Sequence, residues 1–290
     1  MIHRTQTEAY VLLRPMATFA PLVFSSPHSG RDYPSAFLDA TVLDSRLIRS
    51  SEDAFVDKLF AAAPHHGMPL LAARAPRAWL DLNRACDELD PALIEGVSRA
   101  PHNPRISSGL GVIPRVVAQG RPIYRGKLPR SEAEARLRAH WHPYHDRLRN
   151  LMTETESRFG EAVLIDCHSM PHEAIETHAR PGNSHPEVVL GDRFGAAAGR
   201  VVMDRIETAF RRAGLRVARN APFAGAYIAQ TYGRPSRGHH AVQVEIDRAL
   251  YMDEARIEPR PDFPAFQALM AEVVADLAES FAPDRRLAAE

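Results

Sequence analysis

The chain has 290 residues, of which 45% are hydrophobic and 25% are charged, as is typical of a protein that buries a substantial core. Basic and acidic residues both number 36, so no net charge favours binding to nucleic acid or to an anionic membrane. The only cysteines are Cys86 and Cys167, which excludes a disulfide framework and fits a reducing cytoplasm. We expect one large cytoplasmic domain over residues 1–290.

Membrane insertion and secretion are not expected. Arg14 and Pro15 interrupt the apolar stretch near the N-terminus, so it does not have the pattern of a secretory signal. No window reaches the ~18 consecutive apolar residues that a membrane-spanning helix needs.

Strand and helix patterns alternate along the chain. Apolar runs closed by polar or turn residues predict buried strands at 21–30, 68–74, 161–169 and 240–248. Helical spacing of apolar residues predicts helices from about 51, over 131–160 with a kink at Pro143, over about 193–213 and over about 264–282. This alternation predicts an α/β fold with a mixed, mostly parallel central sheet flanked by helices.

The segment 85–130 differs from the rest of the chain. It is rich in Pro, Gly and Arg and has little periodicity, which predicts long loops over one edge of the core. Loops of this length in a compact domain often carry function, so we expect a lid or a substrate-binding wall here.

His28 and His168 are the first candidates for chemistry. Each follows a buried strand and precedes a serine, and ligands of α/β sheets gather beyond the carboxyl ends of strands. Two such histidines could converge on one metal ion. The alternative for either residue alone is a histidine that hydrogen-bonds to the loop backbone.

A hydrolytic zinc site needs three protein ligands and an open position, so a carboxylate is expected beside the two histidines. Asp53 and Glu52 are the nearest candidates, although Asp53 could equally be a charge favoured at a helix N-terminus. Asp166 lies two residues before His168 on the same strand face. It could orient the imidazole of His168, or it could be a buried hydrogen-bonded acid.

Two further clusters suit an acidic substrate and a proton transfer. Asn83 and Arg84 could bind a carboxylate, because Arg offers a planar fork of donors; the alternative is an Arg84 that pairs with Asp81 or Asp87 on the surface. Gln243, Glu245 and Asp247 alternate with apolar residues and share one strand face. If that face opens on the metal, Glu245 can act as general base; if it is solvated, these are ordinary outer residues.

Seven segments together resemble the N-formylglutamate amidohydrolase family. They are SSPHSGRDYP, SEDAFVDKLF, LDLNR, PYH at 143–145, DCHSMP, LGDRFG and VQVEIDRALYMDE, in order from about residue 20 to 255. The resemblance implies a fold similar to the zinc carboxypeptidase and aspartoacylase-like hydrolases, of the phosphorylase/hydrolase-like type. The wider superfamily takes two ligands from a His-x-x-Glu motif, but position 31 here is Arg.

The resemblance also implies roles for individual residues. Zinc would be held by His28, His168 and a carboxylate, for which Asp53 is chosen over Glu52. Asn83 and Arg84 would hold a substrate carboxylate, Glu245 would be the catalytic base, and His145 and Arg248 would line the pocket.

The implied reaction is hydrolysis of N-formyl-L-glutamate to formate and L-glutamate, the last step in one route of histidine degradation. The expected partner is therefore a small acidic N-acyl amino acid; nothing indicates an oligomeric state. One alternative is a related metal-dependent deacylase or carboxypeptidase acting on another N-acyl amino acid or a peptidoglycan fragment. A different-class alternative is a non-catalytic metal-binding or small-molecule-binding module. A serine hydrolase is disfavoured, because neither Ser29 nor Ser169 lies in a G-x-S-x-G motif.

Overall fold

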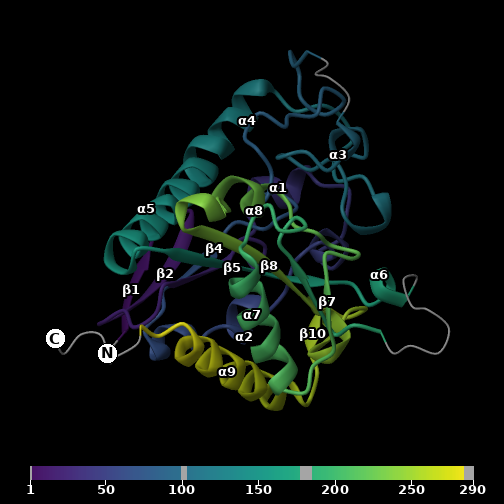
Figure 1. The fold of residues 1–290 in the computed structure, drawn as a ribbon. Coiled ribbons are helices and arrows are strands. Elements are labelled where there is room, and N and C mark those ends of the chain that lie inside the picture. The colour runs from purple at the N-terminus through teal and green to yellow at the C-terminus, as the bar shows by residue number, and fades with distance from the viewer. Residues whose placement is uncertain (1, 99–102, 177–184, 284–290) are drawn as a thin grey trace.

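The computed structural model describes residues 2–98, 103–176 and 185–283. Within these ranges a sheet of eight strands forms the centre of the molecule, in the order β1-β2-β4-β3-β5-β8-β6-β7 (Figure 1). The strands are β1 Ile2–Gln6, β2 Tyr10–Pro15, β3 Leu22–Ser26, β4 Leu70–Ala73, β5 Ala162–Met170, β6 Val188–Gly191, β7 Val217–Arg219 and β8 His239–Asp247. A separate two-stranded ribbon pairs β9 Met252–Asp253 with β10 Glu258–Pro259.

The sheet is mixed, as predicted. Strand β3 runs parallel to β4 and β5, β5 runs parallel to β8, and β6 runs parallel to β7. The other neighbours, β1–β2, β2–β4 and β6–β8, are antiparallel. The four strands that the sequence predicted are β4, β3, β5 and β8, and they form the contiguous centre of the sheet.

Helices cover both faces of the sheet. The described helices are α1 Ser35–Ala40, α2 Val56–Leu59, α3 Pro104–Ser107, α4 Arg130–Arg136, α5 His142–Phe159, α6 Glu173–Glu176, α7 Arg200–Arg212, α8 Tyr227–Tyr232 and α9 Phe263–Ser280. Short 3-10 turns lie at Leu47–Arg49, Ala63–His66, Ala118–Gly120, Pro235–Arg237 and Arg248–Leu250. Helices α2, α7 and α9 lie on one side of the sheet, and α5 and α8 lie on the other (Figure 1). The protein is a single α/β domain, as the sequence predicted.

The alternation of side chains along the central strands divides the core and decides where polar groups emerge. In β5, Val163, Ile165 and Cys167 pack towards α7 and α9, whereas Ala162 and Leu164 pack towards α5. Continuing the second series along β5 brings Asp166 and His168 onto the face that α5 covers. The same alternation in β8 brings Gln243 and Glu245 onto that face.

Three helices differ from the sequence prediction for reasons of backbone geometry. The helix expected from about 51 is reduced to α2, because Phe55 adopts φ 66°, a left-handed conformation that stops a helix from beginning earlier. The helix expected from about 193 begins only at Arg200, because Arg193, Phe194 and Gly195 all have left-handed φ. The long helix is interrupted by a π-helical turn over Leu137–Trp141, just before Pro143, which lacks an amide proton.

The strands β1, β2, β6 and β7 were not predicted. The hairpin β1–β2 is largely half-buried or exposed, so its sequence lacks a clear apolar run. As predicted, the described part of the segment 85–130 is mostly irregular and contains only α3, the 3-10 turn at Ala118–Gly120 and the first residue of α4. Among the described helices, none combines the length and the hydrophobicity that crossing a bilayer would need.

Candidate active site

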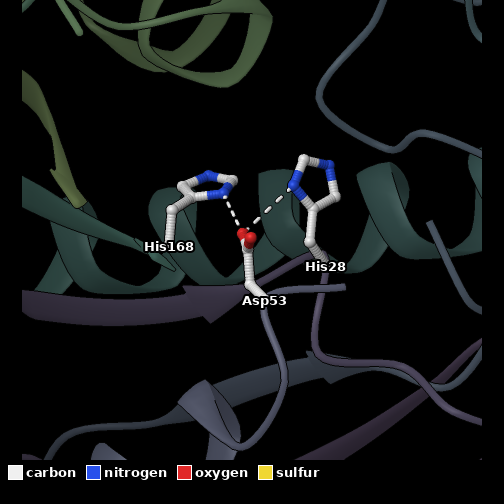
Figure 2. Close-up of side chains that lie close together, drawn as sticks. All are labelled: His28, Asp53 and His168. Carbon is white, nitrogen blue, oxygen red and sulfur yellow. Dashed lines mark hydrogen bonds and ion pairs between the residues drawn. The ribbon is translucent and has the colours of Figure 1, made fainter. Parts of the chain in front are cut away.

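His28, Asp53 and His168 come together in a buried cluster. His28 lies two residues after β3, Asp53 lies in the irregular segment before α2, and His168 lies within β5. One possible ligand atom from each residue lies within 4.8 Å of the others. The amide of Asp53 donates to the carbonyl of His28 at 3.0 Å, which ties the two loops together. Figure 2 shows the carboxylate of Asp53 between the two imidazole rings.

The distances in the cluster suit a shared metal ion. The Asp53 Oδ2 atom lies 2.9 Å from Nδ1 of His168 and 3.3 Å from Nδ1 of His28. The Nδ1 atom of His28 is buried and has no hydrogen-bond partner among the described residues. Such a nitrogen is costly to bury unless it has a ligand. Two imidazole nitrogens and one carboxylate oxygen form a donor set that fits a catalytic zinc ion.

Buried carboxylates lie behind both histidines. The Nε2 atom of His28 lies 2.7 Å from Oδ1 of Asp81, and the Nε2 atom of His168 lies 2.9 Å from Oδ2 of Asp166. An imidazole that donates its Nε2 proton to a carboxylate keeps its Nδ1 lone pair for a metal ion. Asp166 therefore takes the place expected of an orienting acid, and Asp81 takes the matching place behind His28.

Glu52 points to other partners. Its carboxylate accepts hydrogen bonds from Tyr33 Oη at 2.6 Å and from Arg49 Nε at 3.0 Å. These contacts occupy Glu52 away from the histidines, so the geometry brings Asp53, rather than Glu52, into the cluster.

Arg248 holds the second oxygen of Asp53. Its Nη2 donates to Asp53 Oδ1 at 3.0 Å, and its Nε donates to Ser169 Oγ at 3.1 Å. Burial opposes ionisation of Asp53, but the close contacts with His168 and His28 outweigh burial and hold its pKa well below the ordinary value. Asp53 is therefore a charged carboxylate whose Oδ2 faces the two histidines.

Glu245 lies beside His168, its register partner across the β5–β8 pair. Gln243 Nε2 donates to Glu245 Oε1 at 2.7 Å and fixes the carboxylate. Burial raises the pKa of Glu245 to about 7, helped by the charge of Asp53 and opposed by that of His168. A carboxyl group with a pKa near neutrality is suited to both accepting and returning a proton.

A cavity of about 780 Å³ opens onto these groups. Its inner wall includes His28, His168 and Glu245, together with Asn83 and Arg84. Its outer wall comes from the long loop region and includes Arg105, Ser108, Leu110, Pro114, Val116, Val117, Ala118, Gln119 and Gly120. The region 85–130 thus supplies a wall of the cavity.

Asn83 and Arg84 are buried at this cavity rather than on the surface. Asn83 Oδ1 accepts from the amide of Ile228 at 2.7 Å, which leaves the amide nitrogen of Asn83 directed at Gln243 and the cavity. Arg84 donates from Nε to the carbonyl of Leu110 at 2.9 Å and from Nη1 to the carbonyl of Asn83 at 2.7 Å. The surface position of the alternative is therefore wrong, although Arg84 Nη2 does lie 3.9 Å from Asp81 Oδ2.

His145 does not line the cavity. Its Nε2 donates to the carbonyl of Leu82 at 2.9 Å, and its Nδ1 lies 2.9 Å from Tyr232 Oη. With both ring nitrogens occupied inside the fold, His145 supports the backbone that carries Asn83, so the expected direct contact with substrate does not fit its position.

Two cavity arginines were missed by sequence reasoning. Arg77 Nε donates to Asp81 Oδ2 at 3.1 Å, and Arg105 lines the outer wall. The four-residue spacing from Arg77 to Asp81 is a signal for an ion pair, but the segment has no helical pattern that would have made the spacing meaningful. Arg105 has no such signal.

Comparison with known proteins identifies the family. Residues 20–252 match the family model of N-formylglutamate amidohydrolase. The N-formylglutamate deformylase of Pseudomonas aeruginosa is 31% identical over 238 residues, which cover 81% of this chain and 83% of that protein. The enzyme of the same name from Pseudomonas putida is 31% identical over 237 residues, covering 81% and 82%.

Two solved structures are similar to this chain over most of its length. The N-formylglutamate amidohydrolase of Ralstonia eutropha JMP134 superposes with a TM-score of 0.88 at 34% identity, covering 95% of this chain and 99% of that chain. A gene product of Agrobacterium tumefaciens shares the fold, with a TM-score of 0.64 at 16% identity over 94% and 96%. The chain therefore belongs to the N-formylglutamate amidohydrolase family and is an amidohydrolase.

Proposed function

We propose that the protein catalyses zinc-dependent hydrolysis of N-formyl-L-glutamate to formate and L-glutamate. The observation that carries the proposal is that His28, Asp53 and His168 form one buried cluster beside Glu245, with His28, His168 and Glu245 facing the same cavity. The relatives named N-formylglutamate deformylase support the choice of substrate.

His28, Asp53 and His168 would hold the metal through their Nδ1, Oδ2 and Nδ1 atoms, with Asp81 and Asp166 orienting the rings. Zinc in such a site supplies Lewis-acid polarisation of the acyl oxygen and lowers the pKa of water to ~7.

Glu245 would carry the proton through the reaction. Its carboxylate takes a proton from the attacking water and then passes it to the departing amine nitrogen, so that the glutamate product leaves as a neutral amine. The second proton of the water stays on the formic acid product until it is released to solvent. The hydrogen bond from Gln243 keeps one carboxylate oxygen fixed during both transfers.

Asn83 and Arg84 would hold the α-carboxylate of the substrate. An Asn side-chain nitrogen has two protons, and Gln243 Oε1 accepts one of them at 3.4 Å. His168 Nε2 lies 3.3 Å from the same nitrogen but cannot accept the other proton while it donates its own proton to Asp166, so the second proton is available to the substrate. Arg84 keeps Nη2 for the substrate, because Nε and Nη1 are fixed on backbone carbonyls. This leaves the acyl carbon as the part of the substrate directed towards Glu245.

Formate release and hydrolysis of acyl analogues test the proposal. The purified protein is given N-formyl-, N-acetyl- and N-succinyl-L-glutamate at equal concentrations, before and after chelation and after zinc is restored. N-formyl-L-glutamate should have the highest kcat/KM, and activity should be lost on chelation and regained with zinc.

The outcomes separate the alternatives. A higher kcat/KM for either analogue would replace the named reaction by deacylation of another N-acyl amino acid. Full activity in the chelated, metal-free protein would contradict the metal site. Zinc binding without turnover of any of the three compounds would instead support the non-catalytic module.

A further inference from the structure

Among the described residues, four arginines line the cavity: Arg77, Arg84, Arg105 and Arg248. Two of them are paired with carboxylates inside the protein. Arg77 Nε lies 3.1 Å from Asp81 Oδ2, and Arg248 Nη2 lies 3.0 Å from Asp53 Oδ1. These two cations compensate acids of the site and are not free to neutralise a ligand.

The other two arginines have no carboxylate within hydrogen-bond distance among the described residues. Arg84 comes closest, with Nη2 3.9 Å from Asp81 Oδ2. Arg105 makes no ion pair with any described residue, and its side chain is exposed at the outer wall. Arg84 therefore has only this long contact with a carboxylate, and Arg105 has none among the described residues.

The charges of Arg84 and Arg105 repel each other, and both residues contact or belong to the same loop. Burial lowers the pKa of Arg84; Asp81 opposes this, and the positive charges of Arg77 and Arg105 add to it. Arg84 Nε is bonded to the carbonyl of Leu110, five residues after Arg105. The two guanidinium groups are thus close enough to repel, and a bound anion would relieve that repulsion.

The backbone at Arg105 is fixed in spite of the irregular loop. The Asn103 Oδ1 atom accepts from the amides of Arg105 at 3.0 Å and Ile106 at 3.4 Å, which caps the first turn of α3. The Asn103 side-chain nitrogen donates to Glu88 Oε2 at 3.3 Å. Only the long side chain of Arg105 is left to adjust to a ligand.

We propose that Arg105 binds the side-chain carboxylate of the substrate and sets the preference of the enzyme for N-acyl amino acids with two carboxylates. The inference rests on the proposed function, in which Arg84 and Asn83 hold the α-carboxylate. Two guanidinium groups without a close carboxylate match the two carboxylates of an N-acyl glutamate, because Arg84 can donate from Nη2 and Arg105 can form a charge-assisted, bidentate pair. A substrate with a neutral side chain would leave Arg105 without a partner.

Arg105→Gln tests this role with two substrates that differ only in charge. N-formyl-L-glutamate is compared with N-formyl-L-glutamine, which has almost the same shape but an uncharged amide. The variant should lower kcat/KM for N-formyl-L-glutamate by about 10- to 100-fold, mainly through KM, as expected for loss of a charged hydrogen bond. It should leave kcat/KM for N-formyl-L-glutamine nearly unchanged, and Arg105→Lys should recover part of the loss.

Arg125→Gln is the matched control. Arg125 is exposed in the same loop region but does not line the cavity, so its substitution should leave kcat/KM unchanged for both substrates. An Arg105→Gln variant that affects both substrates equally, or neither, would overturn the inference and leave the proposed function standing. A wild-type protein that does not hydrolyse N-formyl-L-glutamate would instead overturn both.

Discussion

Asp81 connects the candidate metal-binding cluster to Asn83 and Arg84, the proposed substrate-binding residues. Its Oδ1 atom lies 2.7 Å from His28 Nε2 and accepts from the amide of Asn83 at 2.8 Å, while Oδ2 faces Arg77 at 3.1 Å. Burial opposes ionisation of Asp81, but His28, Arg84 and Arg77 together hold its pKa well below the ordinary value. One charged side chain therefore fixes both a candidate metal ligand and the turn that carries Asn83 and Arg84.

Asp81→Asn should weaken zinc binding by about 10- to 100-fold, because the outer partner of His28 loses its charge. The same substitution should raise KM, because the backbone amide of Asn83 would donate to a neutral amide oxygen in place of the charged carboxylate of Asp81. Zinc affinity is measured by competition with a chromophoric chelator. Glu52→Gln is the control, because Glu52 contacts Tyr33 and Arg49 instead; an equal loss of zinc affinity in both variants would contradict the assignment.

Glu245 and His168 are register partners on neighbouring strands, but their substitutions should have different effects on zinc binding and on turnover. Glu245→Gln should retain zinc and lose about 10²- to 10⁴-fold in kcat, as expected when a general base is removed. His168→Ala should lose zinc and, with it, activity. Metal analysis of the purified variants and formate release make the comparison; activity retained in both variants would contradict the proposed roles.

The turn after β3 is built against the segment after β4. A Cβ atom at Gly30 would lie 2.1 Å from the carbonyl oxygen of Ala75 and 2.6 Å from that of Arg74. The amide of Asp32 donates to the same Arg74 carbonyl at 3.0 Å. The two segments thus run in contact, and this contact sets the position of His28 relative to the chain that leads to Asp81.

Gly30→Ala should therefore force backbone apart next to His28. We expect a loss of roughly 1–3 kcal/mol or more in the free energy of unfolding, since overpacking against backbone has no cheap relief. Zinc affinity should fall as well. Gly126→Ala is the control, since nothing lies within 4 Å of its Cβ position. Urea denaturation of both variants decides the point: unchanged stability of Gly30→Ala would contradict the close approach.

The elements that the sequence predicted well are those with an unbroken apolar run. Strands β3, β5 and β8 are buried almost throughout, so composition alone revealed them. Strands β1 and β2 escaped prediction because a half-exposed hairpin has no such run. The start of α7 was misplaced because the left-handed backbone at 193–195 is a property of the fold and leaves no mark in hydrophobic periodicity.

The residues of the candidate site also differ in how far the sequence could indicate them. His28, His168 and Glu245 could be singled out as candidates from the sequence because each lies at or near the carboxyl end of a predicted strand. The choice between Glu52 and Asp53 could not be made from spacing, because it depends on which side chain Arg49 engages. The contact of His28 with Asp81 spans 53 residues, and no local pattern encodes it.

At the scale of the whole molecule, the face of the sheet covered by α5 and α8 carries both core and chemistry. His145 of α5 contacts both α8 and the segment before Asn83. Its Nε2 lies 2.9 Å from the carbonyl oxygen of Leu82, and its Nδ1 lies 2.9 Å from Tyr232 Oη of α8. Because Nε2 donates to a carbonyl, Nδ1 of a neutral ring can only accept, and the hydroxyl proton of Tyr232 is shared between this nitrogen at 2.9 Å and the carbonyl oxygen of His145 at 3.1 Å. A neutral His145 therefore joins α5, α8 and the segment that leads to Asn83.

This arrangement should make the stability of the whole protein depend on pH through His145. Burial lowers the pKa of His145 from 6.5 to about 4, although the hydrogen bond to Leu82 acts in the opposite direction. Between these two values the unfolded chain binds a proton that the folded protein excludes. The contribution of His145 is therefore undiminished above the unfolded pKa and is lost as the pH falls towards about 4.

The loss should amount to about 2 kcal/mol in the free energy of unfolding between about pH 7.5 and about pH 5. His145→Gln keeps a polar side chain but cannot titrate, so its stability should fall less over this interval, whatever its stability at the higher pH. Urea denaturation of both proteins at the two pH values gives the difference in slope, in which the titration of all other groups cancels. Parallel pH dependence in the two proteins would show that His145 is free to take up a proton in the folded state, and the neutral link between α5, α8 and the Asn83 segment would then be wrong.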